Sequence, residues 1–600
     1  MTAMIGEHGA IKSAPPRRLG HGAMLALVIF ASMVCLVLLT LPDMVKWRFG
    51  DADDMMRLQE VRDWLAGQSW FDLTQYRIAP PGGLSMHWSR LLDVPLAAVI
   101  LMVRPFAGEH LAELSASILV PLITFALIAM TVAAITRRML ASDQPALLAA
   151  FFTVANIGTI SVARPMRIDH HGWQALCALV MVLALIGDRN RRRAAVAGVF
   201  AAFWMHVSLE GIVFTAGCGA WLGLSWIAGR ERCRDALPVF LAAAAAASLG
   251  FFVSVHGFAL FARTFCDAVS PVHIVVLALA AAGSSLAVRL APDGMIGRGL
   301  TLGAVALVAA ATYRLWAPQC SGGAFSSLTP LTYRLWYLTV DEGLPLWTQP
   351  ATLALGWVAF PLVGLIGAAH GLRSASPDRR PLMIDYLAML VIATLIGIVV
   401  MRASAMANLL AIPGSLIIFA PLWKRAQAIS SMLARIAVSA AVTILAVPLT
   451  PACLVLAAVP YKPTNKPAQE QRIESCLAAS NMVHFDALPK SVIMTTLDTS
   501  QALIFMSHQS AVGAGYHRNV ASMTDVIRFF TADDATAHDI MRVRHARYAF
   551  VCPGDGDALT YTKASPAGLA SRLEEGEPPL WLKPVQTPGL RYAKVYKLID

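Results

Sequence analysis

The 600-residue sequence has few charged residues and no sustained alternation of apolar and polar positions. Asp, Glu, Lys and Arg make up only 14% of the chain, whereas soluble domains carry about a quarter. Hydrophobic residues make up 57% and occur in continuous runs. The low charge excludes a string of soluble domains, and the lack of alternation favours helices over a transmembrane barrel. The composition therefore predicts a polytopic α-helical membrane protein.

Several other patterns are absent. The chain has no internal repeat, no low-complexity tract, no cysteine spacing typical of zinc sites and no Gly-x-Ser-x-Gly frame typical of hydrolases. Lys and Arg exceed Asp and Glu by 48 to 37, a net charge of +11. In a membrane protein this excess belongs in cytoplasmic loops, so we expect no nucleic-acid partner.

The first apolar run, residues 24–41, follows Lys12, Arg17 and Arg18 and has no small-residue cleavage site after it. We interpret it as a retained first span with a cytoplasmic N-terminus. Twelve more spans are expected, centred near residues 125, 153, 180, 202, 219, 245, 280, 307, 360, 392, 415 and 445.

Thirteen spans place every basic cluster between spans on the cytoplasmic side. The short apolar run 91–103 would break this parity, so we interpret it as a re-entrant or interfacial helix on the outer side. The large outer segments are then residues 43–110, residues 313–350 and the C-terminal part of the chain.

The C-terminal part changes character after a Pro/Lys/Asn linker at residues 460–467. Strands are predicted at 491–497, 502–506, 548–552 and 592–599, and helices at 469–479, 524–530 and 535–544. We therefore divide the chain into a transmembrane domain, residues 1–459, and an extracytoplasmic α/β domain, residues 460–600.

Four of the nine cysteines fall on the outer side of the membrane, where disulfides are permitted. Cys266 with Cys320 and Cys476 with Cys552 are the natural pairs, because each pair lies within one region. Free buried thiols remain the alternative, since spacing does not determine connectivity.

Three acidic clusters fall where the outer face meets the membrane. They are Asp51, Asp53 and Asp54 after the first span, Asp169 with His170 and His171 after the third, and Asp341 with Glu342 before the tenth. Carboxylates at this boundary are costly unless they are paired, solvated or bound to a cation. Asp, Glu and His suit Mg²⁺ or Mn²⁺, which neutralises a diphosphate leaving group.

These clusters resemble the motifs of the GT-C membrane glycosyltransferases, and most closely the catalytic subunit of oligosaccharyltransferase in its bacterial and archaeal single-subunit form. Residues 53–58 read Asp-Asp-Met-Met-Arg-Leu, like the family's first-loop acidic motif. Residues 169–171 read Asp-His-His, as in archaeal second loops. Residues 339–342 read Thr-Val-Asp-Glu, similar to the family's Thr-Ile-x-Glu motif.

The resemblance implies roles for individual residues. Asp53 would bind the metal and contact the acceptor, and Asp169 and His171 would complete the Mn²⁺ or Mg²⁺ site. Glu342 would contact the acceptor, and Arg402 would bind the lipid diphosphate. Further accessory candidates are Asp54, His170, Asp341, His517 and Arg518.

The chain departs from the family where a Trp-Trp-Asp-Tyr-Gly motif reads the glycosylation sequon. Residues 496–500 read Thr-Leu-Asp-Thr-Ser instead. A protein, a lipid or a glycan is therefore an open choice of acceptor.

The expected function is transfer of a sugar or oligosaccharide from a polyprenyl-(di)phosphate carrier, with help from a metal, at the outer face of a bacterial inner membrane. The enzyme alternative is a single-sugar GT-C transferase that modifies lipid or envelope glycan without metal. The non-enzyme alternative is a secondary transporter, which the absence of related halves disfavours.

Overall fold

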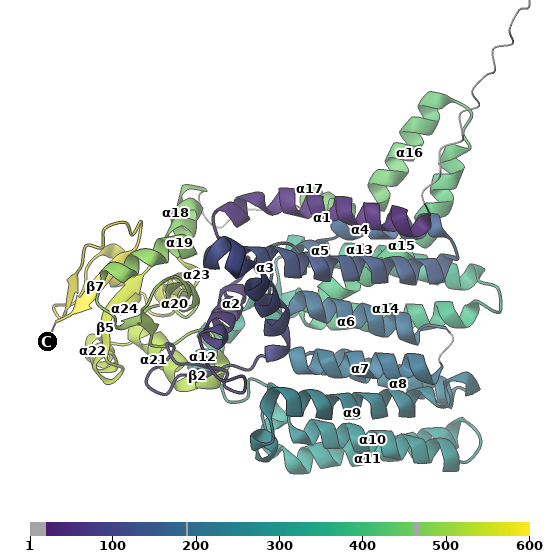
Figure 1. Cartoon of the computed structure of the whole chain (residues 1–600), viewed down its shortest axis with the longest axis horizontal. Coiled ribbons are helices and arrows are strands. Elements are labelled where there is room, and N and C mark those ends of the chain that lie inside the picture. The colour runs from purple at the N-terminus through teal and green to yellow at the C-terminus, as the bar shows by residue number, and fades with distance from the viewer. Residues whose placement is uncertain (1–19, 188–189, 460–466, 600) are drawn as a thin grey trace, which may run out of the picture.

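The computed structural model describes residues 20–187, 190–459 and 467–599. Long helices lie side by side in a bundle, and the C-terminal α/β part lies at one end of it (Figure 1). We call residues 467–599 the C-terminal domain. Lys12, Arg17, Arg18 and most of the predicted linker at 460–467 lie outside the described ranges.

The chain before the linker is almost entirely helical. In order, its helices are α1 (His21–Val45), α2 (Ala52–Leu65), α3 (Asp93–Leu140), α4 (Asp143–Val154), α5 (Ile157–Val162), α6 (His171–Leu185), α7 (Arg191–Val207), α8 (Gly211–Ile227), α9 (Ala236–His256), α10 (Pro271–Leu290), α11 (Met295–Trp316), α12 (Pro330–Leu335), α13 (Ala351–Ser374), α14 (Arg380–Val399), α15 (Ser404–Gln427), α16 (Met432–Ala446) and α17 (Thr450–Ala458). Two short strands, β1 (Thr74–Gln75) and β2 (Leu84–Ser85), pair antiparallel in the loop between α2 and α3.

By length and composition, eight helices in the described ranges can cross a membrane, or nine if α16 and α17, bent by 85°, form one span. The class of polytopic helical protein with a C-terminal α/β part is confirmed. Each of the thirteen predicted spans coincides with a helix or a helix pair, but α4, α6, α7 and α8 are not among the helices long and apolar enough to cross a membrane. The span near residue 153 is interrupted, because the Asn156 side chain accepts from the N–H of Gly158 and starts α5 anew.

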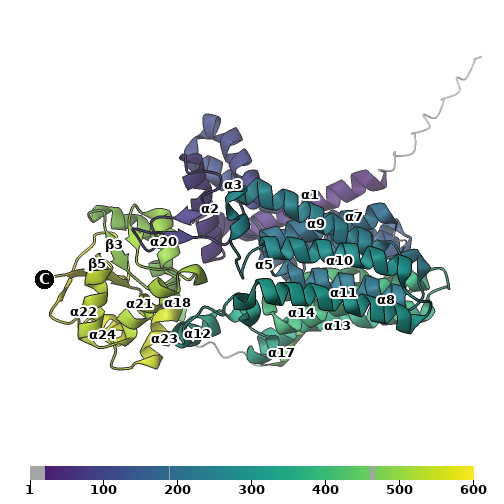
Figure 2. The same cartoon turned by 90° about the horizontal axis from the view of Figure 1, so that it is seen from below.

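The apolar run 91–103, which we expected as a separate helix, forms the first part of α3. The two parts of α3 meet at Gly108, whose φ of 79° is outside the helical region and is readily adopted only by glycine. In Figure 2 this first part projects beside the C-terminal domain, away from the other long helices.

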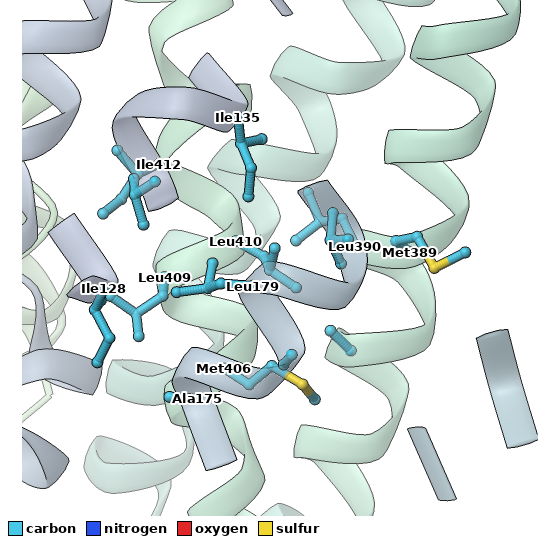
Figure 3. Close-up of a cluster of buried hydrophobic side chains, with 14 of the residues drawn as sticks. Ile128, Ile135, Ala175, Leu179, Met389, Leu390, Met406, Leu409, Leu410 and Ile412 are labelled. Carbon is cyan, nitrogen blue, oxygen red and sulfur yellow. The ribbon is translucent and has the colours of Figure 1, made fainter. Parts of the chain in front are cut away.

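The core of the bundle is a continuous apolar cluster contributed by α3, α6, α14 and α15 (Figure 3). Ile128, Leu179, Leu390 and Leu409 have no exposed surface. Close approach of α13 and α15 requires small residues, since a methyl group on Gly367 would lie 2.0 Å from the Gly414 carbonyl oxygen. This packing fixes the helix ends that carry the acidic residues.

The C-terminal domain contains a mixed five-stranded sheet of order β4-β3-β5-β7-β6. β3 runs parallel to β4 and β5, while β7 runs antiparallel to β5 and β6. The strands are β3 (Val492–Met494), β4 (Ser510–Ala511), β5 (Ala546–Val551), β6 (Leu582–Pro584) and β7 (Lys594–Leu598), and the helices are α18 (Pro467–Leu477), α19 (Ala479–Met482), α20 (Ser500–Met506), α21 (Val520–Thr531), α22 (Asp534–Val543), α23 (Gly556–Ala564) and α24 (Leu569–Glu575).

The strand predicted at 502–506 is wrong, because this segment belongs to helix α20. Ser500 to Phe505 are all buried, so the segment has neither the alternation of a strand nor an amphipathic helical pattern. Short, fully buried apolar runs carry no periodicity that separates the two structures. The other predicted strands and helices of the domain coincide with β3, β5, β7, α18, α21 and α22.

Both cysteine pairs that the sequence suggested are disulfides in the structure, Cys266 with Cys320 and Cys476 with Cys552. The first joins the loop after α9 to the segment after α11. The second joins α18 to the end of β5.

Arg62 fastens α2 to both the bundle and the C-terminal domain. Its guanidinium forms two bonds of 2.6 and 2.7 Å with the Glu113 carboxylate on α3. It also donates to the Phe505 carbonyl oxygen at 2.7 Å and lies over the Phe505 ring. The bidentate pair with Glu113 has a fixed geometry, so it holds α2 in one orientation between α3 and the C-terminal domain.

We predict that Asp557→Asn stabilises the protein at pH 8. Burial, helped by the neighbouring Asp555 carboxylate, raises the pKa of Asp557 to about 7. A raised carboxyl pKa contributes stability at low pH that is lost as the pH rises through the folded-state value. The variant avoids this loss and should melt about 2 to 4 °C higher at pH 8, with the advantage shrinking towards pH 5.

The measurement is thermal unfolding of the purified full-length protein in detergent across this pH range. The control is Asp539→Asn, at an exposed position of α22. A pH-independent difference between Asp557→Asn and the original protein would contradict the prediction.

Candidate functional site

The first acidic cluster forms the start of α2. The Asp51 side chain caps the helix by accepting from the N–H of Asp53 at 3.0 Å, which places Asp53 and Asp54 in the first turn. Asp54 is completely buried. Its Oδ1 accepts from the backbone N–H groups of Ile168 at 2.7 Å and Asp169 at 3.0 Å. Asp54 therefore joins the first acidic cluster directly to the second.

Arg167 is shared by carboxylates from both clusters. Its guanidinium lies 3.1 Å from Asp54, 2.8 Å from Asp169 and 3.5 Å from Asp51. Burial by itself would raise the pKa of Asp169, but Arg167 and the neighbouring histidines lower it well below the usual value. Asp169 is thus kept ionised in a buried position.

His171 begins α6 and faces two carboxylates. Its Nε2 lies 3.7 Å from Asp169 Oδ2 and 4.0 Å from Glu342 Oε1. Its Nδ1 lies 3.2 Å from Gln174 Oε1, one turn further along α6, which orients the ring. The second and third acidic clusters therefore meet at one imidazole nitrogen.

Arg402 links the third cluster to a cavity in the bundle. It contacts Glu342 at 3.1 Å and also forms an ion pair with Glu210, which in turn accepts from Gln174 at 3.4 Å. His171, Gln174, Glu210 and Arg402 line one side of a cavity of about 190 Å³. The remaining lining is mostly apolar and includes Val213, Phe214, Ile396 and Met406. Such a cavity suits a charged group attached to an apolar chain.

Asp53 faces the C-terminal domain. The Tyr516 hydroxyl donates to Asp53 Oδ1 at 3.1 Å. Burial and the carboxylates of Asp51, Asp169 and Glu342 together raise the pKa of Asp53 to about 8. The same residue is therefore in electrostatic contact with all three acidic clusters.

The charges around Asp53 are unbalanced. Arg167 and Arg402 between them contact five carboxylates, and Asp53 contacts neither arginine. A divalent cation would offset this excess, and Asp53, Asp169 and His171 offer the oxygen and nitrogen ligands that such an ion takes. The donor types therefore suit the metal that the resemblance implies, but the ligand atoms of Asp53, Asp169 and His171 do not all lie within 4.8 Å of one another.

A different group of residues has its ligand atoms closest together. In the described part of the chain, His87, Asp267 and His517 are the three whose side-chain ligand atoms all lie within 4.8 Å of one another. His517 and Arg518, predicted as accessory residues, both bind Asp267 and do not contact the acidic clusters.

Two other accessory candidates stand apart from the central contacts. Asp341 has an exposed side chain, and its backbone carbonyl accepts from Gln349. His170 is buried with its ring 4.3 Å from the His171 ring, centroid to centroid, and its Nδ1 has no hydrogen-bond partner among the described residues.

Several residues of the site were not selected from the sequence. Gln174 lies one turn after His171 on α6, and Arg167 lies two residues before Asp169, so a search of the neighbouring residues would have found both. Tyr516 and Asp267 carried no such signal. Tyr516 is 463 residues from Asp53, and the contact depends on how the C-terminal domain docks.

A tryptophan lies beside the segment that lacks the family's tryptophans. A methyl group built on Gly515 would lie 3.1 Å from both Asp498 Oδ1 and Trp336 Nε1. Trp336 comes from the loop after α12 and packs in the core of the C-terminal domain. The indole N–H and the carboxylate thus lie side by side, next to the tyrosine that contacts Asp53.

No protein-family model matches the chain, and no curated protein sequence matches it. Solved structures of the archaeal oligosaccharyltransferase AglB from Archaeoglobus fulgidus do match. The apo form has a TM-score of 0.68 over 91% of this chain and 71% of that chain, at 14% sequence identity. The chain has the oligosaccharyltransferase fold. The predicted GT-C-like class is confirmed.

Two further structures of AglB match to a similar extent. The complex with an inhibitory peptide and a dolichol-phosphate has a TM-score of 0.66, with 14% identity and coverage of 92% of this chain and 72% of that chain. The complex with Zn and sulfate has a TM-score of 0.61, with 14% identity and coverage of 91% and 71%. At this identity the similarity is one of fold.

We predict that Asp54→Ala strongly destabilises the protein. The substitution leaves two buried N–H groups without an acceptor and removes a partner of Arg167, a change that costs about 3 to 5 kcal/mol for a buried ion pair. Asp54→Asn keeps an acceptor oxygen and should cost less. The measurement is the melting temperature of the purified protein, with Asp539→Ala as the exposed control. Equal melting of Asp54→Ala and this control would contradict the role assigned to Asp54.

Proposed function

We propose that the protein transfers a sugar or oligosaccharide from a polyprenyl-(di)phosphate carrier to an acceptor. The observation that carries this proposal is the junction of the acidic site with the amphipathic cavity. Glu342 contacts Arg402, which lines the cavity, and also approaches His171, which faces Asp169. A group on an apolar chain and a hydrophilic acceptor would meet at this junction.

Arg402 is the proposed contact for the carrier phosphate. It has two carboxylate partners, Glu210 and Glu342, which hold its guanidinium at the cavity wall. Phosphate oxygens accept from a guanidinium in the same bidentate way as carboxylates, so the carrier phosphate would replace one of them. The dolichol-phosphate in the AglB complex supports a donor of this lipid class.

Asp53, Asp169 and His171 are proposed to hold Mn²⁺ or Mg²⁺. When bound, the cation supplies a positive charge that stabilises the departing (di)phosphate. Asp54 and Arg167 fix the Asp169 backbone and side chain, and Gln174 fixes the His171 ring. These residues determine where the ligands point before any substrate enters.

Asp53 and Glu342 are proposed to receive the acceptor. Both carboxylates are partly accessible to solvent. Each has oxygens that can accept a proton from a hydroxyl or orient an amide N–H. Tyr516 holds Asp53 from the side of the C-terminal domain. Trp336 and Asp498 lie on the same side and would contact the part of the acceptor that follows the reacting group.

The proposed location is a bacterial inner membrane, crossed several times. Residues 460–600 would form a periplasmic domain, and the long loops 43–110 and 313–350 would share its side. This placement agrees with the contacts of α2 and of the segment around Trp336 with the C-terminal domain.

A single-sugar GT-C transferase that acts on lipid or envelope glycan is the second candidate. The absence of tryptophan from residues 496–500 favours it over transfer to a protein sequon. In this reading Asp53 acts as a base and metal is dispensable.

We predict that transfer depends on Asp53 and on a divalent cation. Membranes would be incubated with labelled polyprenyl-linked donor and either a sequon peptide or extracted envelope lipid, with Mn²⁺ or with chelator. Asp53→Asn should lower transfer at least about 100-fold, since it removes the acceptor contact and a metal ligand. Asp539→Asn, in the same chain but at an exposed position, should retain activity.

The outcomes separate the candidates. Chelator-sensitive labelling of the peptide supports the oligosaccharyltransferase-type reaction, and labelling of lipid that persists in chelator supports the second candidate. No labelling of either acceptor across several donors, or full activity of Asp53→Asn, would refute glycan transfer through this site.

We further predict that Tyr516→Phe lowers kcat about tenfold and leaves KM within about twofold, because a hydrogen bond to a charged group contributes about 1.5 to 3 kcal/mol. The ring remains, so its packing against Trp88 is retained. Tyr592→Phe, at an exposed position of the same domain, is the matched control. An unchanged kcat would show that the hydroxyl does not position Asp53.

A further inference from the structure

His87, Asp267 and His517 come from three segments that are far apart in the sequence. His87 lies in the loop after β2, Asp267 in the loop between α9 and α10, and His517 in a short turn of the C-terminal domain. His517 Nε2 lies 2.9 Å from Asp267 Oδ2, and the His87 and His517 rings are 5.0 Å apart, centroid to centroid. All three ligand atoms lie within 4.8 Å of one another.

His87 has no hydrogen-bond partner in the described part of the chain. Its Nδ1 is buried and unpaired, although a buried polar atom is normally bonded. The ring is held between the rings of Trp88 and His517. An imidazole in this position has a nitrogen available for a ligand.

The backbone around Asp267 is held in place. The disulfide of Cys266 precedes Asp267 directly, and the Ser270 hydroxyl bonds both the N–H and the carbonyl of Phe265. Asp267 therefore projects from a loop with little freedom to move.

Arg518 supports two of the three segments. It binds both oxygens of Asp267, at 2.7 and 2.9 Å, and donates to the carbonyl oxygen of Met86, next to His87. Carboxylate ligands of metals are commonly held by such an outer hydrogen bond. The positive charge of Arg518 also opposes a cation nearby, so binding should be reversible and sensitive to chelator.

We propose that His87, Asp267 and His517 bind a Zn²⁺-type divalent cation that fastens the C-terminal domain to two loops of the bundle. Two imidazoles and one carboxylate select a borderline metal, whereas Mg²⁺ and Ca²⁺ prefer oxygen ligands. Three protein ligands leave a fourth tetrahedral position for water. This site is separate from the one assigned to Asp53, Asp169 and His171.

The site lies close to the acidic clusters. His517 directly follows Tyr516, whose hydroxyl donates to Asp53. His87, Asp267 and His170 line one small cavity of about 30 Å³. A cation bound to His517 would therefore keep the Tyr516 hydroxyl within hydrogen-bond distance of Asp53, and it would also hold the C-terminal domain against the two loops.

The test measures Zn²⁺ bound to purified full-length protein after chelator treatment, by elemental analysis and by the shift in melting temperature. An Asp169→Asn background removes a ligand of the other proposed site, so that the readout does not depend on glycan transfer. In this background we expect one equivalent of Zn²⁺ and a rise in melting temperature on adding the metal.

Adding His87→Ala or His517→Gln should abolish both effects. Glutamine at 517 retains an N–H donor for Asp267, so the fold contact survives while the imidazole is lost. The matched control is His508→Ala, because His508 pairs with Asp486 at 2.8 Å in the same domain without a third ligand. Absence of bound Zn²⁺ in the Asp169→Asn protein, or equal binding after His87→Ala, would overturn the proposal.

Discussion

The site depends on one buried carboxylate that accepts hydrogen bonds from two backbone N–H groups. Asp54 binds the N–H groups of Ile168 and Asp169, which lie more than a hundred residues away in the chain. A backbone donor cannot rotate away as a side chain can, so this contact fixes the second acidic cluster relative to α2. Arg167 then balances Asp54 and Asp169 together. Without this contact, α2 and the segment that carries Asp169 and His171 would not be fixed relative to each other.

The excess of carboxylates around Asp53 destabilises the folded state locally. Asp53 forms no ion pair with an arginine of the described ranges, and burial and neighbouring carboxylates raise its pKa to about 8. Groups perturbed in this way gather at functional sites, because the same charge that opposes folding attracts a cation or a proton there. Other buried charges are paired, as Arg57 is with Asp93 at 2.9 Å.

The C-terminal domain completes the site as well as covering it. Tyr516 reaches Asp53, and the Arg62 contact with Phe505 holds α2 against the domain. The chain shares the fold of AglB at 14% identity, so the arrangement of helices and domain tolerates extensive substitution.

Local patterns in the sequence determined the membrane class, the position of each apolar helix and the three acidic clusters, and they suggested the two cysteine pairs. Hydrophobic runs and span parity are short-range properties, and they place polar groups at one end of a bundle. The tertiary structure alone decided that residues 500–506 form a helix, that His517 and Arg518 bind Asp267, and that Tyr516 contacts Asp53. These contacts join residues hundreds of positions apart, and they arise from the packing of the whole chain, which no local pattern encodes.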